Sequence, residues 1–154
     1  MARRKYRLIE TKMLSDWLAK VYPDCRKVIR TWLGPVGESA ELDRAGVTTR
    51  VLLPFGGGWV DAIIMGPTWT RLVEACVVAD TRHVGQLEGY VRLFRETEEY
   101  RDRWDMAVIP VLLYGYPRTL ALRMARDKGY ETIRYAPDFI RAYYHETVGI
   151  VPRR

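Results

Sequence analysis

The stretch GGGWVDAIIMGPTWTRLVEACVVADTRHVGQLEGY, residues 56–90, decides the fold and holds most of the candidate chemistry. Within it, WVDAIIM and TRLVEACVV are short apolar runs rich in β-branched residues, and GPTW joins them. A Gly-Pro pair between two such runs favours a turn, so the stretch predicts a β-hairpin. Asp61 lies on its first strand and Glu74 on its second.

Both acids have apolar neighbours on their own strands. Side chains alternate between the faces of a strand, so Asp61 shares a face with Ile63. By the same rule, Glu74 shares a face with Leu72 and Cys76. An ionised carboxylate in apolar surroundings is costly unless a metal ion, a cation or hydrogen bonds compensate it. The pair is therefore the first candidate for a functional site.

Length and charge bound the class of protein. A chain of 154 residues has the usual size of one domain, and we expect a single domain over 1–154. Its formal net charge is +6, and its 25 cationic residues are mostly arginine. Arginine favours partners with phosphate or carboxylate groups, and nucleic acid is the first candidate. A GC-rich genome would equally explain the preference for arginine over lysine, although not the positive charge.

Cysteine usage and hydropathy indicate the compartment. Cys25 and Cys76 each lie in an apolar strand context, which predicts buried free thiols and a reducing environment. No apolar run approaches the length of a membrane span, and the start MARRKYRLIE lacks the apolar core of a signal peptide. We expect a cytoplasmic or virion-associated protein without membrane contact.

Hydrophobic spacing and breakers predict the remaining elements. Beyond the hairpin, helices are expected over 8–21, 84–100, 117–128 and 137–144, and strands over 25–33, 47–53, 104–114 and 130–135. The polar segment 36–45 is compatible with a loop or a short helix. Pro110 favours an edge position or a bulge for its strand, and the glycines at 56–58 favour a tight turn over close approach of a ligand. The order predicts an α/β fold with a mixed sheet flanked by helices, a basic arm over 1–7 and a frayed tail over 148–154.

This order of elements resembles the PD-(D/E)XK, or restriction-endonuclease-like, nuclease superfamily. The resemblance rests on an acid in the first helix, Asp61 and Glu74 on the hairpin, a Gln-x-x-x-Tyr pattern at Gln86 and Tyr90, and a final strand-helix-strand. It extends over roughly 8–135 and is closest in outline to Holliday-junction resolvases and RecB-like nucleases.

The resemblance implies a metal site. Asp61, Glu74 and the main-chain carbonyl of Ala75 would hold one or two divalent ions, Mg²⁺ or Mn²⁺, which activate water and stabilise charge on the scissile phosphate. Glu10 is the preferred third carboxylate, and Glu38 competes for that role. The plain alternatives are a solvated or salt-bridged strand carboxylate for each hairpin acid and a helix-dipole interaction for Glu10. Gln86 would lie near the catalytic site.

One position departs from the pattern of the superfamily. The lysine expected two residues after Glu74 is replaced by Cys76, and a thiol supplies neither charge nor a good hydrogen-bond donor. Arg82, His83 or Arg92 are candidates to replace that lysine. The remaining alternative is that catalysis has been lost and the fold retained for binding or assembly.

Basic residues supply candidate nucleic-acid contacts. The N-terminal arm contains Arg3, Arg4, Lys5 and Arg7, and Arg82 and Arg92 follow the acidic strand. A second cationic face is expected from Arg118, Arg123 and Arg126. The resulting expectation is a DNA-binding nuclease-like protein with metal-dependent phosphodiester hydrolysis, with RNA as the second choice of substrate. The alternative is a non-catalytic structural protein on the same fold, such as a phage particle component. Its surplus of tryptophan would then serve a protein partner or a homo-oligomer.

Overall fold

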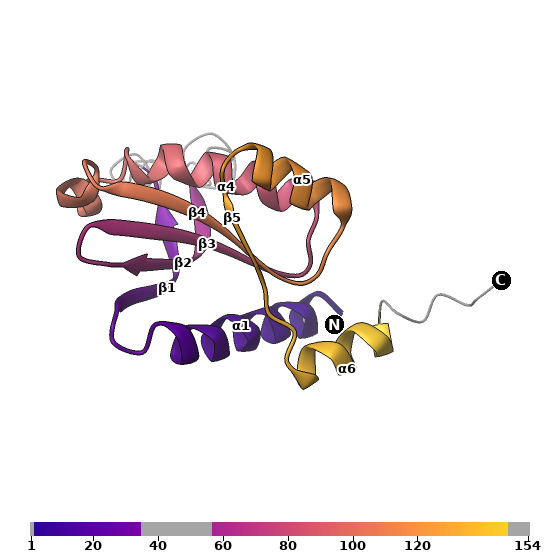
Figure 1. Ribbon diagram of the computed structural model, residues 1–154. Coiled ribbons are helices and arrows are strands. Elements are labelled where there is room, and N and C mark those ends of the chain that lie inside the picture. Colours follow the sequence, from indigo (N-terminus) through magenta and orange to yellow (C-terminus); the bar gives the residue numbers. More distant parts are fainter. Residues whose placement is uncertain (1, 35–56, 148–154) are drawn as a thin grey trace, which may run out of the picture. The chain divides into compact units, whose positions relative to one another are not determined.

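The computed structural model describes residues 2–34 and 57–147, with side chains from Tyr6 onward. Its helices are α1 (Ala2–Val21), α4 (Thr81–Phe94), the 3₁₀ helix η2 (Glu98–Arg103), α5 (Thr119–Asp127) and α6 (Asp138–Thr147). Its strands are β1 (Arg26–Leu33), β2 (Gly58–Met65), β3 (Trp69–Val78), β4 (Ala107–Tyr116) and β5 (Glu131–Arg134). Figure 1 shows these elements along the chain.

The chain divides into two compact units. Unit 1 comprises Met1–Cys25, Ala75–Val84 and Val111–Arg154, and unit 2 comprises Arg26–Glu74 and Gly85–Pro110. The strand order is β1-β2-β3-β4-β5, and β3, β4 and α4 each pass from one unit into the other. The sheet is mixed and flanked by helices, which confirms the expected α/β class.

Unit 2 is built on the predicted hairpin. β2 pairs antiparallel with β3 from Met65↔Thr70 to Ala62↔Val73, and β1 pairs antiparallel with the other edge of β2. The inner part of the hairpin is fully buried, which accounts for the nearly continuous apolar runs in the sequence. The hairpin therefore presents Asp61 and Glu74 from a rigid support.

Arg103 holds the turn of this hairpin. Its Nε donates to the hydroxyl of the buried Thr70 at 2.9 Å, and its Nη2 donates to the carbonyl oxygens of Trp69 at 3.1 Å and of Gly66. A Cβ atom added at Gly66 would lie 2.1 Å from the Trp69 ring, so this turn requires glycine. The sequence predicted the turn but not the arginine that fixes it.

The glycines before β2 allow close packing. A Cβ atom added at Gly57 would lie 2.4 Å from the Leu33 carbonyl oxygen and 2.4 Å from the Trp32 ring. Gly58 is already on strand β2 and pairs with Leu33. Gly57 thus permits the close approach of β1. Gly56, the first residue of the turn expected over 56–58, lies outside the described residues.

The helix expected to reach Tyr100 ends earlier, at Phe94. Thr97 Oγ1 donates to the carbonyl oxygen of Leu93 at 2.7 Å and accepts from the main-chain N–H of Gly34 at 2.9 Å. The chain then forms the 3₁₀ helix η2. Its Tyr100 stacks on Phe94, the last residue of α4, with ring centroids 5.3 Å apart. A side-chain bond to the backbone competes with continued helix, and this is the physical reason for the error.

Unit 1 contains the strand-helix-strand that ends the fold. β4 and β5 are parallel, with Val111↔Glu131 to Tyr114↔Arg134 in register, and α5 connects them. Gly129 ends α5 and has a φ of 77°. The N–H of Gly129 donates to the carbonyl oxygen of Arg126, and the N–H of Tyr130 donates to the carbonyl oxygen of Ala125, each at 2.9 Å. This is the helix-ending geometry predicted for that glycine. The edge position expected for β4 is wrong, because β4 lies between β3 and β5, and its pairing with β5 begins one residue after Pro110.

Helix α1 begins at Ala2, six positions before the predicted start at Leu8. No glycine or proline interrupts this segment, and arginine and lysine are good helix formers. The Tyr6 ring also packs on Tyr143 of α6, with centroids 6.0 Å apart, so the first turns gain a tertiary contact. The segment expected as a basic arm is therefore helical from Ala2 within the same unit.

Some sequence predictions lie outside the described residues. These are the strand over 47–53, the segment 36–45 with Glu38, and the tail over 148–154. Arg3, Arg4 and Lys5 belong to α1, but their side chains lie outside the described part. Among the described residues, no helix is long and apolar enough to span a membrane.

Candidate active site on the hairpin

Asp61 and Glu74 occupy equivalent places on the two hairpin strands. The last paired positions of the β2–β3 register are Ala62 and Val73, and the acids are the next residue on each strand. Asp61 is half-buried, whereas Glu74 is only 7% exposed. The two acids therefore lie at one level of the sheet within unit 2.

Tyr90 of α4 lies against this pair. Its hydroxyl donates to the main-chain carbonyl of Trp59 on β2 at 2.7 Å and is also within hydrogen-bonding reach of the Glu74 carboxylate. Burial raises the pKa of Tyr90, and the negative charges of Glu74 and then Asp61 raise it further. The phenol therefore keeps its proton at neutral pH and serves as a hydrogen-bond donor. A Cβ atom added at Gly58 would lie 3.4 Å from the Tyr90 ring, so this glycine leaves room for the tyrosine.

The other predicted residues of α4 do not share this position. Gln86 is on the same helix face as Tyr90, four residues earlier, but its side chain is exposed. Arg92 is exposed two residues after Tyr90, and positions two apart on a helix do not face each other. Of the two residues in the Gln-x-x-x-Tyr pattern, it is Tyr90 whose pKa is raised by the hairpin acids Glu74 and Asp61.

Cys76 and Glu10 belong to a second group, in unit 1. Cys76 is fully buried, and its thiol donates to the Leu113 carbonyl oxygen over 3.6 Å. Glu10 is half-buried on α1 and hydrogen-bonded to Tyr6. Burial raises the pKa of Tyr6, and Glu10 and Cys76 raise it further through their charges. The position expected to hold the lysine is thus a buried thiol that interacts with Tyr6, in a group that includes the carboxylate of Glu10. Ala75 is buried between this residue and Glu74 on β3.

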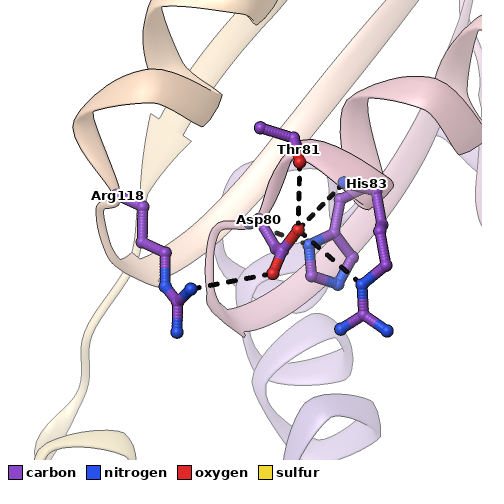
Figure 2. A network of polar contacts seen from close by, with 5 residues as sticks. Asp80, Thr81, His83 and Arg118 are labelled. Atoms are coloured by element: carbon purple, nitrogen blue, oxygen red, sulfur yellow. Dashed lines mark hydrogen bonds and ion pairs between the residues drawn. The ribbon is translucent and has the colours of Figure 1, made fainter.

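Arg82 and His83 are both bound to Asp80, the residue before α4. Figure 2 shows Asp80 together with Thr81, His83 and Arg118. An Asp80 oxygen accepts from the Arg82 N–H at 3.0 Å and from the Thr81 hydroxyl at 3.3 Å, while Arg118 approaches the other oxygen to 3.9 Å. The hydrogen bond from the Arg82 backbone is the main reason that the pKa of Asp80 is lowered. In return, His83 Nδ1 accepts from the Asp80 N–H at 3.0 Å. The bond from the Arg82 N–H to Asp80 and the bond from the Asp80 N–H to His83 cap the helix reciprocally, with histidine in place of the usual glutamate or glutamine.

This cap predicts a loss of stability at mildly acidic pH. Burial lowers the pKa of His83 below the ordinary 6.5, so the folded state holds the ring neutral. The neutral ring of His83 therefore stabilises the folded state fully above pH 6.5. This stabilisation is lost as the pH falls from 6.5 towards the pKa of His83 in the folded state. For one proton the slope is at most about 1.4 kcal/mol per pH unit. Urea unfolding between pH 8 and pH 5 measures it.

Two variants isolate the contribution of His83. His83→Gln removes the titrating ring, so its stability should change less with pH between 6.5 and 5 than that of the parent protein. His145→Gln removes an exposed histidine of α6 and should leave the pH profile as it was. A profile unaltered by His83→Gln would show that the cap does not control this transition.

A shallow cationic groove lies along α5 in unit 1. It has a volume of about 390 Å³ and is lined by Pro117, Thr119, Leu122, Arg123, Arg126 and Asp127. Arg123 and Arg126 are exposed and form no ion pair with any described residue. Arg118, the third arginine expected here, is directed to Asp80 instead.

The sequence matches no protein-family profile and no curated protein. Among solved structures, it is similar to a repair endonuclease from Pyrococcus abyssi, with 13% identity and a TM-score of 0.50, over 82% of this chain and 46% of that one. The chain shares the fold of this endonuclease. It also matches EndoMS in an EndoMS–dsDNA2 complex, with 18% identity, a TM-score of 0.48, and 82% and 44% of the two chains covered. It matches EndoMS in its apo form with 16% identity, a TM-score of 0.44, and coverage of 83% and 46%.

The matched proteins are longer than this chain, which spans less than half of each of their lengths. At such low identity, the likeness establishes the fold alone. The fold agrees with the restriction-endonuclease-like core expected from the order of elements. Within residues 2–34 and 57–147, no group of three or more His, Cys, Asp or Glu side chains is arranged to hold a metal ion.

Proposed function

We propose that this chain is a DNA-binding, nuclease-like protein in which Asp61 and Glu74 hold a divalent cation for phosphodiester hydrolysis. The proposal is supported by the position of both acids at one level of the β2–β3 hairpin, where the charges of both raise the pKa of Tyr90. A fold shared with a repair endonuclease supports it. The net charge of +6 suits a polyanionic partner.

The residues present fit a magnesium or manganese ion. Two adjacent strands fix the two acids, and the Tyr90 hydroxyl, which donates to Trp59 O, lies close to Glu74. Magnesium commonly binds through one or two carboxylates, retaining several waters and taking the remaining ligands from substrate phosphates. A pair of acids is therefore sufficient, with the carbonyl of Ala75 as the further ligand implied by the superfamily. When bound, such an ion activates water and stabilises charge on the phosphate.

The protein's own groups would prepare this site. Two acids at one level of neighbouring strands, Asp61 and Glu74, favour the binding of a cation. Tyr90 keeps its proton and so does not add a third negative charge beside them. Cys76 contributes no charge, because it is a fully buried thiol bonded to a backbone carbonyl. The site therefore needs another source of positive charge for the transferring phosphate.

The groove along α5 is our candidate for a phosphate-backbone contact. Replacing both Arg123 and Arg126 by alanine should weaken DNA binding similarly on all sequences and lower the slope of log affinity against log salt by about 2, one for each arginine. Titration of labelled duplex DNA at several salt concentrations measures both quantities. Arg101→Ala is the matched control, because Arg101 is already paired with Glu98 at 3.1 Å. Equal slopes for the double variant and this control would exclude the groove.

Incubation of the purified chain with duplex, single-stranded and branched DNA tests the main proposal. Cleavage should require Mg²⁺ or Mn²⁺ and stop on addition of EDTA. RNA substrates and a Mn²⁺ binding titration complete the set. Binding of DNA without cleavage or metal affinity would favour the alternative, a non-catalytic structural or assembly protein on the same fold.

A further inference from the structure

The backbone of Arg30 is unusual for a strand residue. Its φ is 51°, and it is the one described residue other than glycine with a positive φ. Such a conformation is uncommon for a residue with a Cβ atom and is costly. Strain of this kind persists where the surrounding structure imposes it, and it is concentrated at functional sites.

The position of Arg30 in the sheet connects it to the candidate active site. β1 pairs with β2 at Ile29↔Ala62 and again at Thr31↔Val60, so Arg30 and Asp61 occupy the position between these pairs. The same register continues on both sides of Arg30, so no inserted residue explains the strain. Arg30, Asp61 and Glu74 therefore follow one another across β1, β2 and β3 at one level of unit 2, on strands spaced about 4.8 Å apart.

The charge of Arg30 is available at this position. Its side chain is exposed, and no described residue forms an ion pair with it. A guanidinium can contact a phosphate through two parallel hydrogen bonds, and it stays protonated at all relevant pH values. The thiol of Cys76 cannot supply the positive charge that a lysine would bring to this site.

We infer that Arg30 is the residue that contacts the scissile phosphate and supplies the positive charge that Cys76 cannot. This inference rests on the proposed function and goes beyond it. Arg30 takes the role for which Arg82, His83 and Arg92 were the candidates in the sequence. Arg82 and His83 are bound to Asp80, and Arg92 lies away from Tyr90 on α4. Arg30 stabilises the charge that develops on the phosphate during hydrolysis, as a fixed cation does at other phosphoryl-transfer sites.

Arg30→Gly is the informative variant, because glycine accepts a positive φ without strain. It should melt at the same or a higher temperature than the parent protein and yet cleave DNA about 100-fold more slowly, as is typical when one stabilising donor is removed. The loss should fall on kcat, with KM changed only a few-fold, and guanidinium ion in the buffer should restore part of the rate. Arg26→Gly, an exposed arginine on the same strand with ordinary backbone, is the matched control and should cleave normally.

A metal titration adds a measurement that does not depend on activity. Without DNA, Arg30→Gly should bind Mn²⁺ about 5-fold more tightly than the parent, since a positive charge near the carboxylates has been removed. Arg26→Gly should bind it as the parent does. Normal kcat in Arg30→Gly, or a rise in KM alone, would overturn the inference and leave the proposed nuclease intact. A parent protein that cleaves no DNA would overturn both.

Discussion

Asp61→Asn is expected to reduce metal-dependent DNA cleavage about 1,000-fold, because loss of a proposed metal ligand removes about 4 kcal/mol of charge stabilisation in the transition state. A tenfold change in rate corresponds to about 1.4 kcal/mol of activation free energy. The amide keeps the shape of the side chain and removes its charge. Initial rates on the substrate that the parent cleaves best, at saturating Mg²⁺, measure the loss. Affinity for Mn²⁺ should fall in parallel, since one carboxylate of the pair no longer carries charge.

The fold should survive this change. Asparagine keeps the size and shape of the half-buried Asp61 and removes one of two acids at one level of the sheet, so the variant should remain folded at the assay temperature. Asp105→Asn, at an exposed aspartate of the same unit, is the matched control and should keep full activity. If Asp61→Asn cleaves and binds Mn²⁺ as Asp105→Asn does, Asp61 is an ordinary strand carboxylate and the proposed metal site is wrong.

Much of this arrangement can be predicted from the sequence because its signals are local. The β-branched runs around Gly66 and Pro67 specify a hairpin, and alternation along each strand places Asp61 and Glu74. The period of α4 likewise brings Tyr90 to one face, and Gly129 ends α5 as expected. Each of these features depends on residues within a few positions of one another.

The features that the sequence did not reveal depend on distant residues. The strained backbone of Arg30 is opposite Asp61, 31 positions away, and no pattern in RKVIRTWL distinguishes it from its neighbours. Helix α4 ends at Phe94 because Thr97 bonds both to Leu93 and to the distant Gly34. Long-range contacts of this kind override local helix propensity. The role of Cys76 as a buried thiol was predicted from its apolar strand, but its carbonyl partner at Leu113 was not.

Arg103→Ala is expected to lower the free energy of unfolding by about 2–4 kcal/mol, because hydrogen bonds from a charged donor are worth more than neutral ones and their loss leaves buried acceptors unsatisfied. The guanidinium joins Thr70, Trp69 and Gly66, so it fixes the turn between the strands that present Asp61 and Glu74. Urea denaturation measures the change directly. In thermal melts it should lower Tm by about 2–4 °C per kcal/mol for a chain of this size. Arg103→Lys keeps the charge but not the planar fork, and it should fall between the parent and the alanine variant.

Arg101→Ala separates this clamp from a general effect of lost charge. Arg101 is two residues earlier in η2, and its ion pair with Glu98 joins side chains that are both 69% exposed. Exposed pairs of this kind contribute about 0–1 kcal/mol, so the control should be nearly as stable as the parent. The rate of DNA cleavage by Arg103→Ala should be proportional to the fraction of the variant that is folded, because Arg103 supports the hairpin turn and is not one of the two proposed metal ligands. Equal stability of the two alanine variants would mean that the turn holds its shape without Arg103, through the Gly66 N–H bond to Trp69 O alone.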